Sequence, residues 1–128
     1  MSTATATGYT GTFRGRADEV SRVRRQVARY LNGCPVTDDA VLAASEFAAN
    51  AVLHSRSRGA HFTIRVQLHA GHVKVECQDA GGPWRGRHHD DDRPHGLSVV
   101  EALTSGPAGW GVQVTGDGGR IIWAQITW

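Results

Sequence analysis

The chain carries three polar side chains at four-residue spacing within an otherwise apolar segment: Glu46, Asn50 and His54. On an α-helix this spacing places all three on one face. Because a buried carboxylate costs several kcal/mol unless it is paired or solvated, a polar stripe on a buried helix favours a wet cavity or a bound ligand. Two other interpretations stay open: the stripe can face solvent at the edge of a sheet, or Asn50 can tie down a neighbouring loop.

A second polar group follows an expected strand, in the run Asp79-Ala80-Gly81-Gly82-Pro83. Glycine adopts positive φ and lets a ligand lie close to the backbone, and a carboxylate at a strand end can accept a hydrogen bond from an amine. The other interpretation is a turn in which Asp79 caps its own backbone. The run therefore indicates either a ligand contact or a simple turn.

A third group, Pro94-His95-Gly96-Leu97, is expected to begin a helix. The N–H groups at a helix start attract phosphate, although every helix has such a start. The run His88-His89-Asp90-Asp91-Asp92 is expected to be a solvated charge cluster, because contiguous residues rarely converge on one metal ion. Nearby, Arg85 and Arg87 can either reach phosphates or simply solvate the segment.

Hydrophobic periodicity predicts the elements that position these groups. Apolar residues at helical spacing indicate three helices: an amphipathic one ending near residue 32, a nearly all-apolar one over about 39–54, and one over about 96–106. Alternation indicates an edge strand at 12–16, a hairpin over 61–79 and a second hairpin over 110–128. Residues 80–94 lose the pattern, and a loop of this length in a compact domain is often a functional lid.

One domain accommodates all these elements. The 128 residues run strand, helix, helix, and then three to four strands with one inserted helix. This order predicts an α+β fold over residues 11–128, a two-layer sandwich with helices on one face of a mixed, mainly antiparallel sheet. The small polar residues 1–10 are expected to form a disordered N-terminal tail.

Composition argues against several classes of function. A formal net charge of +2 is too small for a general nucleic-acid footprint, and no apolar run approaches the ~20 residues that span a bilayer. We do not expect the first residues to form a signal peptide, and the two widely spaced cysteines indicate reduced thiols. We therefore expect a cytoplasmic protein that binds neither a membrane nor nucleic acid directly.

The order of the three polar groups along the chain resembles that of the GHKL ATPase superfamily, whose fold is also called the Bergerat fold. Within it, the chain is similar to the RsbW/SpoIIAB-type anti-sigma factors, the small serine kinases of bacterial partner-switching systems. The resemblance covers about residues 13–128. It rests on residues 45–54 as the N box, 79–83 and 96–100 as the two glycine boxes, and 123–126 as the closing strand.

This resemblance implies an ATP site with named roles. Asn50 would ligate Mg²⁺ through its amide oxygen, a hard ligand for a hard ion. Glu46, one turn earlier, would act as general base on an attacking serine hydroxyl. Asp79 would accept a hydrogen bond from the adenine amino group, and Gly81 would let the purine lie against the backbone.

The phosphate side of the implied site is formed by Gly96 and Leu97, at the start of a helix. Two positions depart from the family pattern. Pro94 stands where the second glycine box usually has its first glycine, which stiffens the backbone and removes one N–H. Ile121 stands where a threonine often helps to hold adenine, and Thr115 on the preceding strand is a candidate substitute.

The function that the resemblance implies is an ATP-binding anti-sigma regulatory factor with protein serine/threonine kinase activity and with ATP and Mg²⁺ as cofactors. Its substrate would be a STAS-type anti-anti-sigma protein, its target a sigma factor, and it would be able to form a homodimer. The alternative is a GHKL-fold binding module with weak or no catalysis that sequesters a sigma factor or another regulator.

Overall fold

The computed structural model of the chain describes residues 7–54, 60–81, 97–104 and 109–128, and the structural statements below refer to these residues. A long helix, α2 (Thr37–His54), forms the centre of the helical layer. Most of its alanines and Phe47 are completely buried, because small side chains let a helix lie close against a sheet. This confirms the predicted apolar helix.

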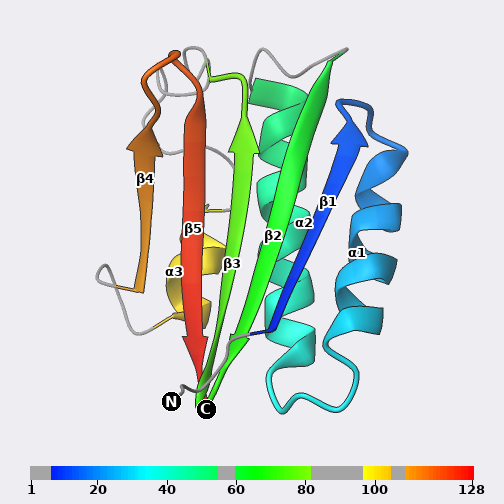
Figure 1. Ribbon diagram of the computed structural model, residues 1–128, viewed down its shortest axis with the longest axis vertical. Helices are drawn as coiled ribbons and strands as arrows, with labels where there is room; N and C mark the ends of the chain where they lie inside the picture. Colours follow the sequence, from blue (N-terminus) through cyan, green and yellow to red (C-terminus); the bar gives the residue numbers. More distant parts are fainter. Residues whose placement is uncertain (1–6, 55–59, 82–96, 105–108) are drawn as a thin grey trace.

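Two shorter helices flank α2 (Figure 1). The amphipathic helix α1 (Glu19–Tyr30) packs against one side of α2 and buries Val23 and Val27, which are four residues apart. The helix α3 (Leu97–Leu103) packs against the other side, where Val100 is fully buried. The apolar stripe of each helix thus faces the common core.

Five strands form one sheet in the order β1-β2-β3-β5-β4. Their bounds are Thr7–Arg14 for β1, His61–His69 for β2, His72–Asp79 for β3, Trp110–Val114 for β4 and Arg120–Thr127 for β5. All four pairings are antiparallel. The α+β sandwich is confirmed, but the described strands lack the parallel pair of a mixed sheet, because β5 lies between β3 and β4 and runs opposite to both.

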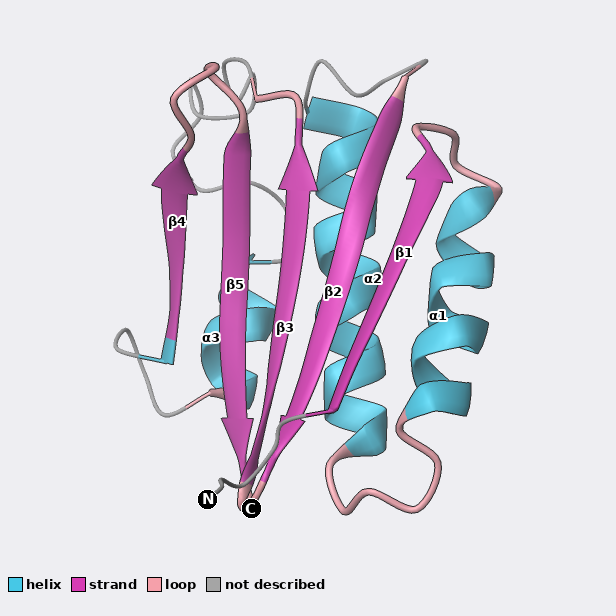
Figure 2. Ribbon diagram, in the orientation of Figure 1, coloured by secondary structure: helices cyan, strands magenta, loops and turns pink. Residues whose placement is uncertain are grey.

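The three described helices lie on the same face of the sheet (Figure 2). The strands turn their apolar side chains to this face, and the largest of those that are fully buried are Phe13, Phe62, Ile64, Ile122 and Ile126. The other face carries polar contacts, such as the 2.9 Å hydrogen bond from Arg65 Nη2 to Gln78 Oε1. This alternation follows from the two-residue period of a strand.

The first strand begins earlier than its sequence suggests. Residues 7–10, expected to belong to a disordered tail, are part of β1 and pair with β2 in the register Thr7↔Leu68 to Thr10↔Arg65. Their order comes from this pairing with a distant segment and not from local periodicity. The remainder of the expected tail, residues 1–6, lies outside the described residues.

The expected lid over residues 80–94 lies almost entirely outside the described residues, as do Gly82, Pro94 and Gly96. In the part of the chain that the structure describes, no helix is long and apolar enough to cross a membrane.

Candidate functional site

The helix α2 and the strand β3 run in the same direction and carry the two main polar groups to one end of the molecule (Figure 1). The buried Sγ of Cys77 donates a hydrogen bond to the carbonyl oxygen of Phe47 at 3.8 Å, which ties the two elements together. Asn50 lies about 4.5 Å further along the helix axis than Phe47. Asp79 lies about 6.6 Å beyond Cys77 along the strand. Both side chains therefore belong to the same end of the core.

Asn50 is the best-defined polar group on α2. The residue is 1% exposed, and its amide Nδ2 has no hydrogen-bond partner among the described residues. A buried polar group left in this state costs about 1–3 kcal/mol. A ligand oxygen would satisfy the amide, and turning the amide by 180° presents its oxygen to a metal ion. Asn50 thus fits the ligand role, and no loop contact among the described residues accounts for its burial.

Glu46 lies one turn earlier on α2 and is half-buried. It stands next to the exposed side of the helix, where Leu53 is 59% exposed. The interpretation that the stripe faces solvent therefore applies to its outer margin but not to Asn50. His54 ends the helix, and its side chain lies outside the described residues.

Asp79 is buried at the end of β3, and each of its carboxylate oxygens accepts a hydrogen bond. Oδ1 accepts from the backbone N–H of Gly81 at 2.7 Å, so the residue does cap its own turn. Oδ2 accepts from Nη2 of Arg120 at 3.3 Å. Burial raises the pKa of the Asp79 carboxyl, and the Gly81 N–H and the Arg120 charge partly oppose this rise.

Gly81 has a conformation and an environment that only glycine tolerates. Its φ is +76°, and a Cβ at this position would collide with the carbonyl oxygen of Gly118. A Cβ on Gly119 would lie 3.0 Å from the carbonyl oxygen of Asp79. The turn between β4 and β5 is therefore packed directly against the turn that follows β3, which the sequence pattern did not indicate.

Arg120 is the site residue that sequence reasoning missed. It pairs with Asp79 in the β3–β5 register, so both side chains lie on the helix-covered face. Ile121, the position assigned to a base contact, pairs with Gln78 and lies on the opposite face. The residue beside Asp79 is therefore Arg120. The hydroxyl of Thr115, the candidate substitute, donates a hydrogen bond to Asp117 Oδ1 within the turn between β4 and β5.

The phosphate side of the implied site is only partly described. Leu97 is the first residue of α3, its side chain is outside the described residues, and Gly96 is outside them altogether. Within the described ranges, no three or more His, Cys, Asp or Glu side chains are grouped to hold a metal ion.

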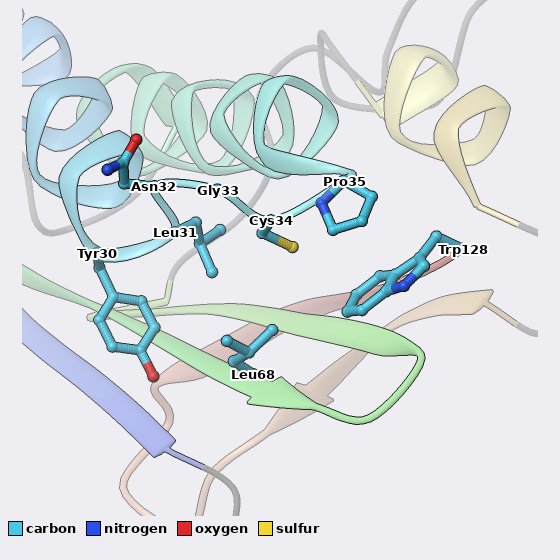
Figure 3. Close-up of a pocket in the computed structure, with 8 residues that line it drawn as sticks. All are labelled: Tyr30, Leu31, Asn32, Gly33, Cys34, Pro35, Leu68 and Trp128. Carbon is cyan, nitrogen blue, oxygen red and sulfur yellow. The ribbon is translucent and has the colours of Figure 1, made fainter.

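A cavity of about 270 Å³ lies at the other end of the molecule, next to the α1–α2 connection and the C-terminus (Figure 3). Tyr30, Leu31, Cys34, Leu68 and Trp128 are among the residues that line it. Asn50 lies in the last two turns of α2 and Asp79 is the last residue of β3. The α1–α2 connection and the C-terminus lie at the end where α2 and β3 begin (Figure 1), so this cavity is separate from the candidate site.

The chain folds as a two-layer α+β sandwich, with Asn50 and Asp79 near the same end of α2 and β3. The profile of the histidine kinase-like ATPase domain family matches residues 13–120, and the chain therefore belongs to this family. Membership confirms the expected GHKL relationship and implies that the domain binds ATP.

A solved structure with a similar fold contains the RsbU and RsbW domains of Rv1364c from Mycobacterium tuberculosis. It superposes with a TM-score of 0.71 at 23% sequence identity over 94% of this chain. The match spans only 32% of that longer chain, so the likeness concerns the fold. No curated protein sequence matches this chain.

Proposed function

We propose that the chain is an ATP-binding anti-sigma regulatory factor with protein serine/threonine kinase activity. Its substrate is a serine or threonine of a STAS-type anti-anti-sigma protein, and the unphosphorylated partner competes with a sigma factor for the chain. The observation that carries this proposal is the buried amide of Asn50, whose Nδ2 has no partner among the described residues, one helical turn from the half-buried carboxylate of Glu46. Binding a sigma factor requires the chain to act in the cytoplasm, and a homodimer is part of the proposal.

The nucleotide is held at two ends in this proposal. Asp79 accepts a hydrogen bond from the adenine amino group, and the backbone near Gly81 forms the surface beside the purine. Asn50 would hold Mg²⁺, which would supply positive charge against the phosphates. Gly96 and Leu97 contact phosphate through backbone N–H groups at the start of α3.

Glu46 takes the proton in the transfer step. The partner's hydroxyl oxygen forms a bond to the γ-phosphorus, the bond from that phosphorus to the β,γ-bridging oxygen breaks, and ADP leaves with that electron pair. The half-buried position of Glu46 supports this role, because a general base must be open to a substrate that arrives from solvent. Positioning and charge neutralisation supply most of the catalysis in phosphoryl transfer.

The partner assignment has separate support. The similar solved structure contains an RsbU domain and an RsbW domain of one protein. For the present chain this supports a role in partner switching.

Phosphate transfer from labelled ATP tests the proposal directly. The full chain is incubated with ATP, Mg²⁺ and a candidate STAS protein, alongside Glu46→Gln and the control Glu76→Gln, which alters a carboxylate on the opposite sheet face that pairs with Lys74. We expect transfer by wild type and the control and a loss of at least about 100-fold in Glu46→Gln. Absence of transfer by wild type, or full transfer by Glu46→Gln, would refute kinase activity.

A second candidate is a binding module with weak or no catalysis that sequesters a regulator. The observation that favours it is the bond from Arg120 to Asp79 Oδ2, because a base must share the oxygen that Arg120 already contacts. Calorimetry separates the two: partner binding with no detectable heat from ATP and Mg²⁺ supports the binding module.

A further inference from the structure

The central helix α2 exposes apolar side chains where the neighbouring helix α1 exposes polar ones. The exposed residues of α1 are all polar: Ser21, Arg22, Arg24, Arg25 and Arg29. On α2, by contrast, Leu42 is 39% exposed and Leu53 is 59% exposed. A single exposed leucine is ordinary on a protein surface, so the meaning of these two depends on where they lie around the helix.

Leu42 and Leu53 lie on either side of the proposed general base, and we call these two residues the leucine face. Because a helix turns by about 100° per residue, Leu42 and Leu53 lie about 40° and about 20° around the axis from Glu46, on the side away from Asn50. Along the axis, Leu42 lies about 6 Å before Glu46 and Leu53 about 10.5 Å after it. The half-buried carboxylate of Glu46 is therefore bordered by exposed apolar side chains at both ends.

The leucine face lies where a protein substrate has to arrive. A general base must come within about 2.6–3.2 Å of the hydroxyl that it deprotonates, so the segment that carries this hydroxyl lies against α2 beside Glu46. An extended segment advances about 3.3 Å per residue. If it runs along α2, it reaches Leu42 about two residues and Leu53 about three residues from the hydroxyl. Apolar side chains at these points would remove the leucines from water, which favours binding.

The charges of α2 favour a basic segment over an acidic one. Between Thr37 and His54 the helix carries three acidic residues and neither lysine nor arginine. Two of the acids, Asp38 and Asp39, lie in the first turn, one turn before Leu42. A basic side chain beyond Leu42 is attracted to this end of the helix, and an acidic one is repelled.

We propose that the leucine face is the docking surface for the phosphoacceptor segment of the substrate protein. The hydroxyl residue of this segment lies at Glu46, and its apolar neighbours cover Leu42 and Leu53. A basic side chain at one end lies opposite Asp38 and Asp39. This inference rests on the proposed kinase function and adds how its substrate is recognised. The leucines contact the substrate away from the reacting atoms, so they determine its affinity and not the rate of phosphate transfer.

Initial rates of phosphate transfer test the leucine face, with labelled ATP and Mg²⁺ at saturation and the STAS protein of the transfer assay at varied concentration. The variants are Leu42→Ala and Leu53→Ala. The control is Trp128→Ala, which removes a side chain that is 47% exposed at the other end of the molecule. In each leucine variant we expect the KM for the STAS protein to rise about tenfold, from the lost burial of one leucine. We expect kcat to stay within about twofold and the affinity for ATP, measured by calorimetry, to stay unchanged.

The double variant Asp38→Asn with Asp39→Asn tests the basic side chain of the segment. Its KM should rise about threefold at low salt, the usual size of an exposed charge interaction. This rise should shrink at high salt, because salt screens exposed charges. An unchanged KM at low salt would overturn the assignment of a basic segment.

The outcomes separate this inference from the proposed function. Phosphate transfer by wild type with an unchanged KM in both leucine variants would overturn the docking surface and leave kinase activity intact. An equal rise of KM in Trp128→Ala, or a fall in kcat with KM unchanged, would also overturn the docking surface. A purely structural role of the leucines would lower the urea midpoint without changing KM, with the same consequence. Absence of transfer by folded wild type would overturn the proposed function and the inference together.

Discussion

Asp79 and Arg120 lie opposite each other on neighbouring strands, 41 residues apart in sequence, with Arg120 Nη2 3.3 Å from Asp79 Oδ2. The pair lies at the same end of the molecule as Asn50 on α2. It joins β3 to β5 at the same point where the glycine turns after β3 and before β5 touch. This end of the molecule therefore combines buried charge, glycine-dependent backbone packing and the amide of Asn50, whose Nδ2 has no partner in the part of the chain that the structure describes.

The raised pKa of Asp79 predicts how nucleotide binding depends on pH. Protonation removes the acceptor, and burial raises the pKa above the ordinary 3.8. Nucleotide affinity should therefore fall as the pH drops through a value above 3.8. Calorimetric titrations between pH 8 and 4.5, with circular dichroism to verify folding, measure this. In Arg120→Thr, which lacks the opposing charge, the loss should occur at higher pH. An affinity that stays constant across this range would contradict the role of Asp79.

The same shift has a consequence for stability. Because the folded chain binds this proton more tightly than the unfolded chain, the contribution of Asp79 is most favourable below pH 3.8. It is lost as the pH rises through the raised pKa. The carboxylate is thus retained at neutral pH at a cost to stability, as expected of a functional group.

Gly81→Ala should be much more harmful than the same change at Gly71. Both glycines have positive φ, but nothing lies within 4 Å of a Cβ on Gly71, whereas a Cβ on Gly81 meets the Gly118 backbone. We expect Gly71→Ala to cost about 1–2 kcal/mol from backbone conformation alone. Gly81→Ala should cost about 2–5 kcal/mol from strain and collision combined. Urea unfolding of both variants measures the difference, and equal losses would refute the packing of the two turns.

Asn50→Ala should leave the free energy of unfolding of the nucleotide-free chain within about 1 kcal/mol of wild type. The reason is that Nδ2 has no partner among the described residues, so its removal relieves a desolvated group. Phe47→Ala, on the same helix and fully buried, should cost about 3–5 kcal/mol and serves as the comparison in denaturant titrations. A loss of similar size for Asn50→Ala would assign the amide a structural role instead.

The two cysteines should differ sharply in reactivity. Cys77 is fully buried, and burial first and the Asp79 charge second raise the pKa of its thiol. Cys34 is half-buried at the rim of the cavity near the C-terminus. Ellman's reagent should therefore modify one thiol quickly in the native chain and both after unfolding. The Cys34→Ser variant should show no fast phase, and a fast phase in that variant would contradict the burial of Cys77.

The sequence predicts the apolar helix and the β2–β3 hairpin well because their periodicity is local. Asn50 was identifiable for the same reason, as a polar residue on a helix that has to be buried. That residues 7–10 form part of a strand could not be predicted locally, because this depends on pairing with β2 across more than 50 residues.

The role of Arg120 could not be predicted from the sequence, because it depends on the order and register of the strands. Its pairing with Asp79 depends on β5 lying between β3 and β4, although α3 and β4 separate β3 from β5 along the chain. Strand alternation then decides which neighbour faces Asp79, and a shift of one residue exchanges Arg120 for Ile121. Only the register of the sheet resolves this choice.

The most direct test of the central claim is a calorimetric titration of the full chain with ATP and Mg²⁺, for wild type, Asn50→Ala and Asp79→Asn. If these residues form the nucleotide site, wild type binds saturably and each variant loses at least about tenfold in affinity while remaining folded. Equal affinity in all three proteins, or no binding by folded wild type, would contradict it.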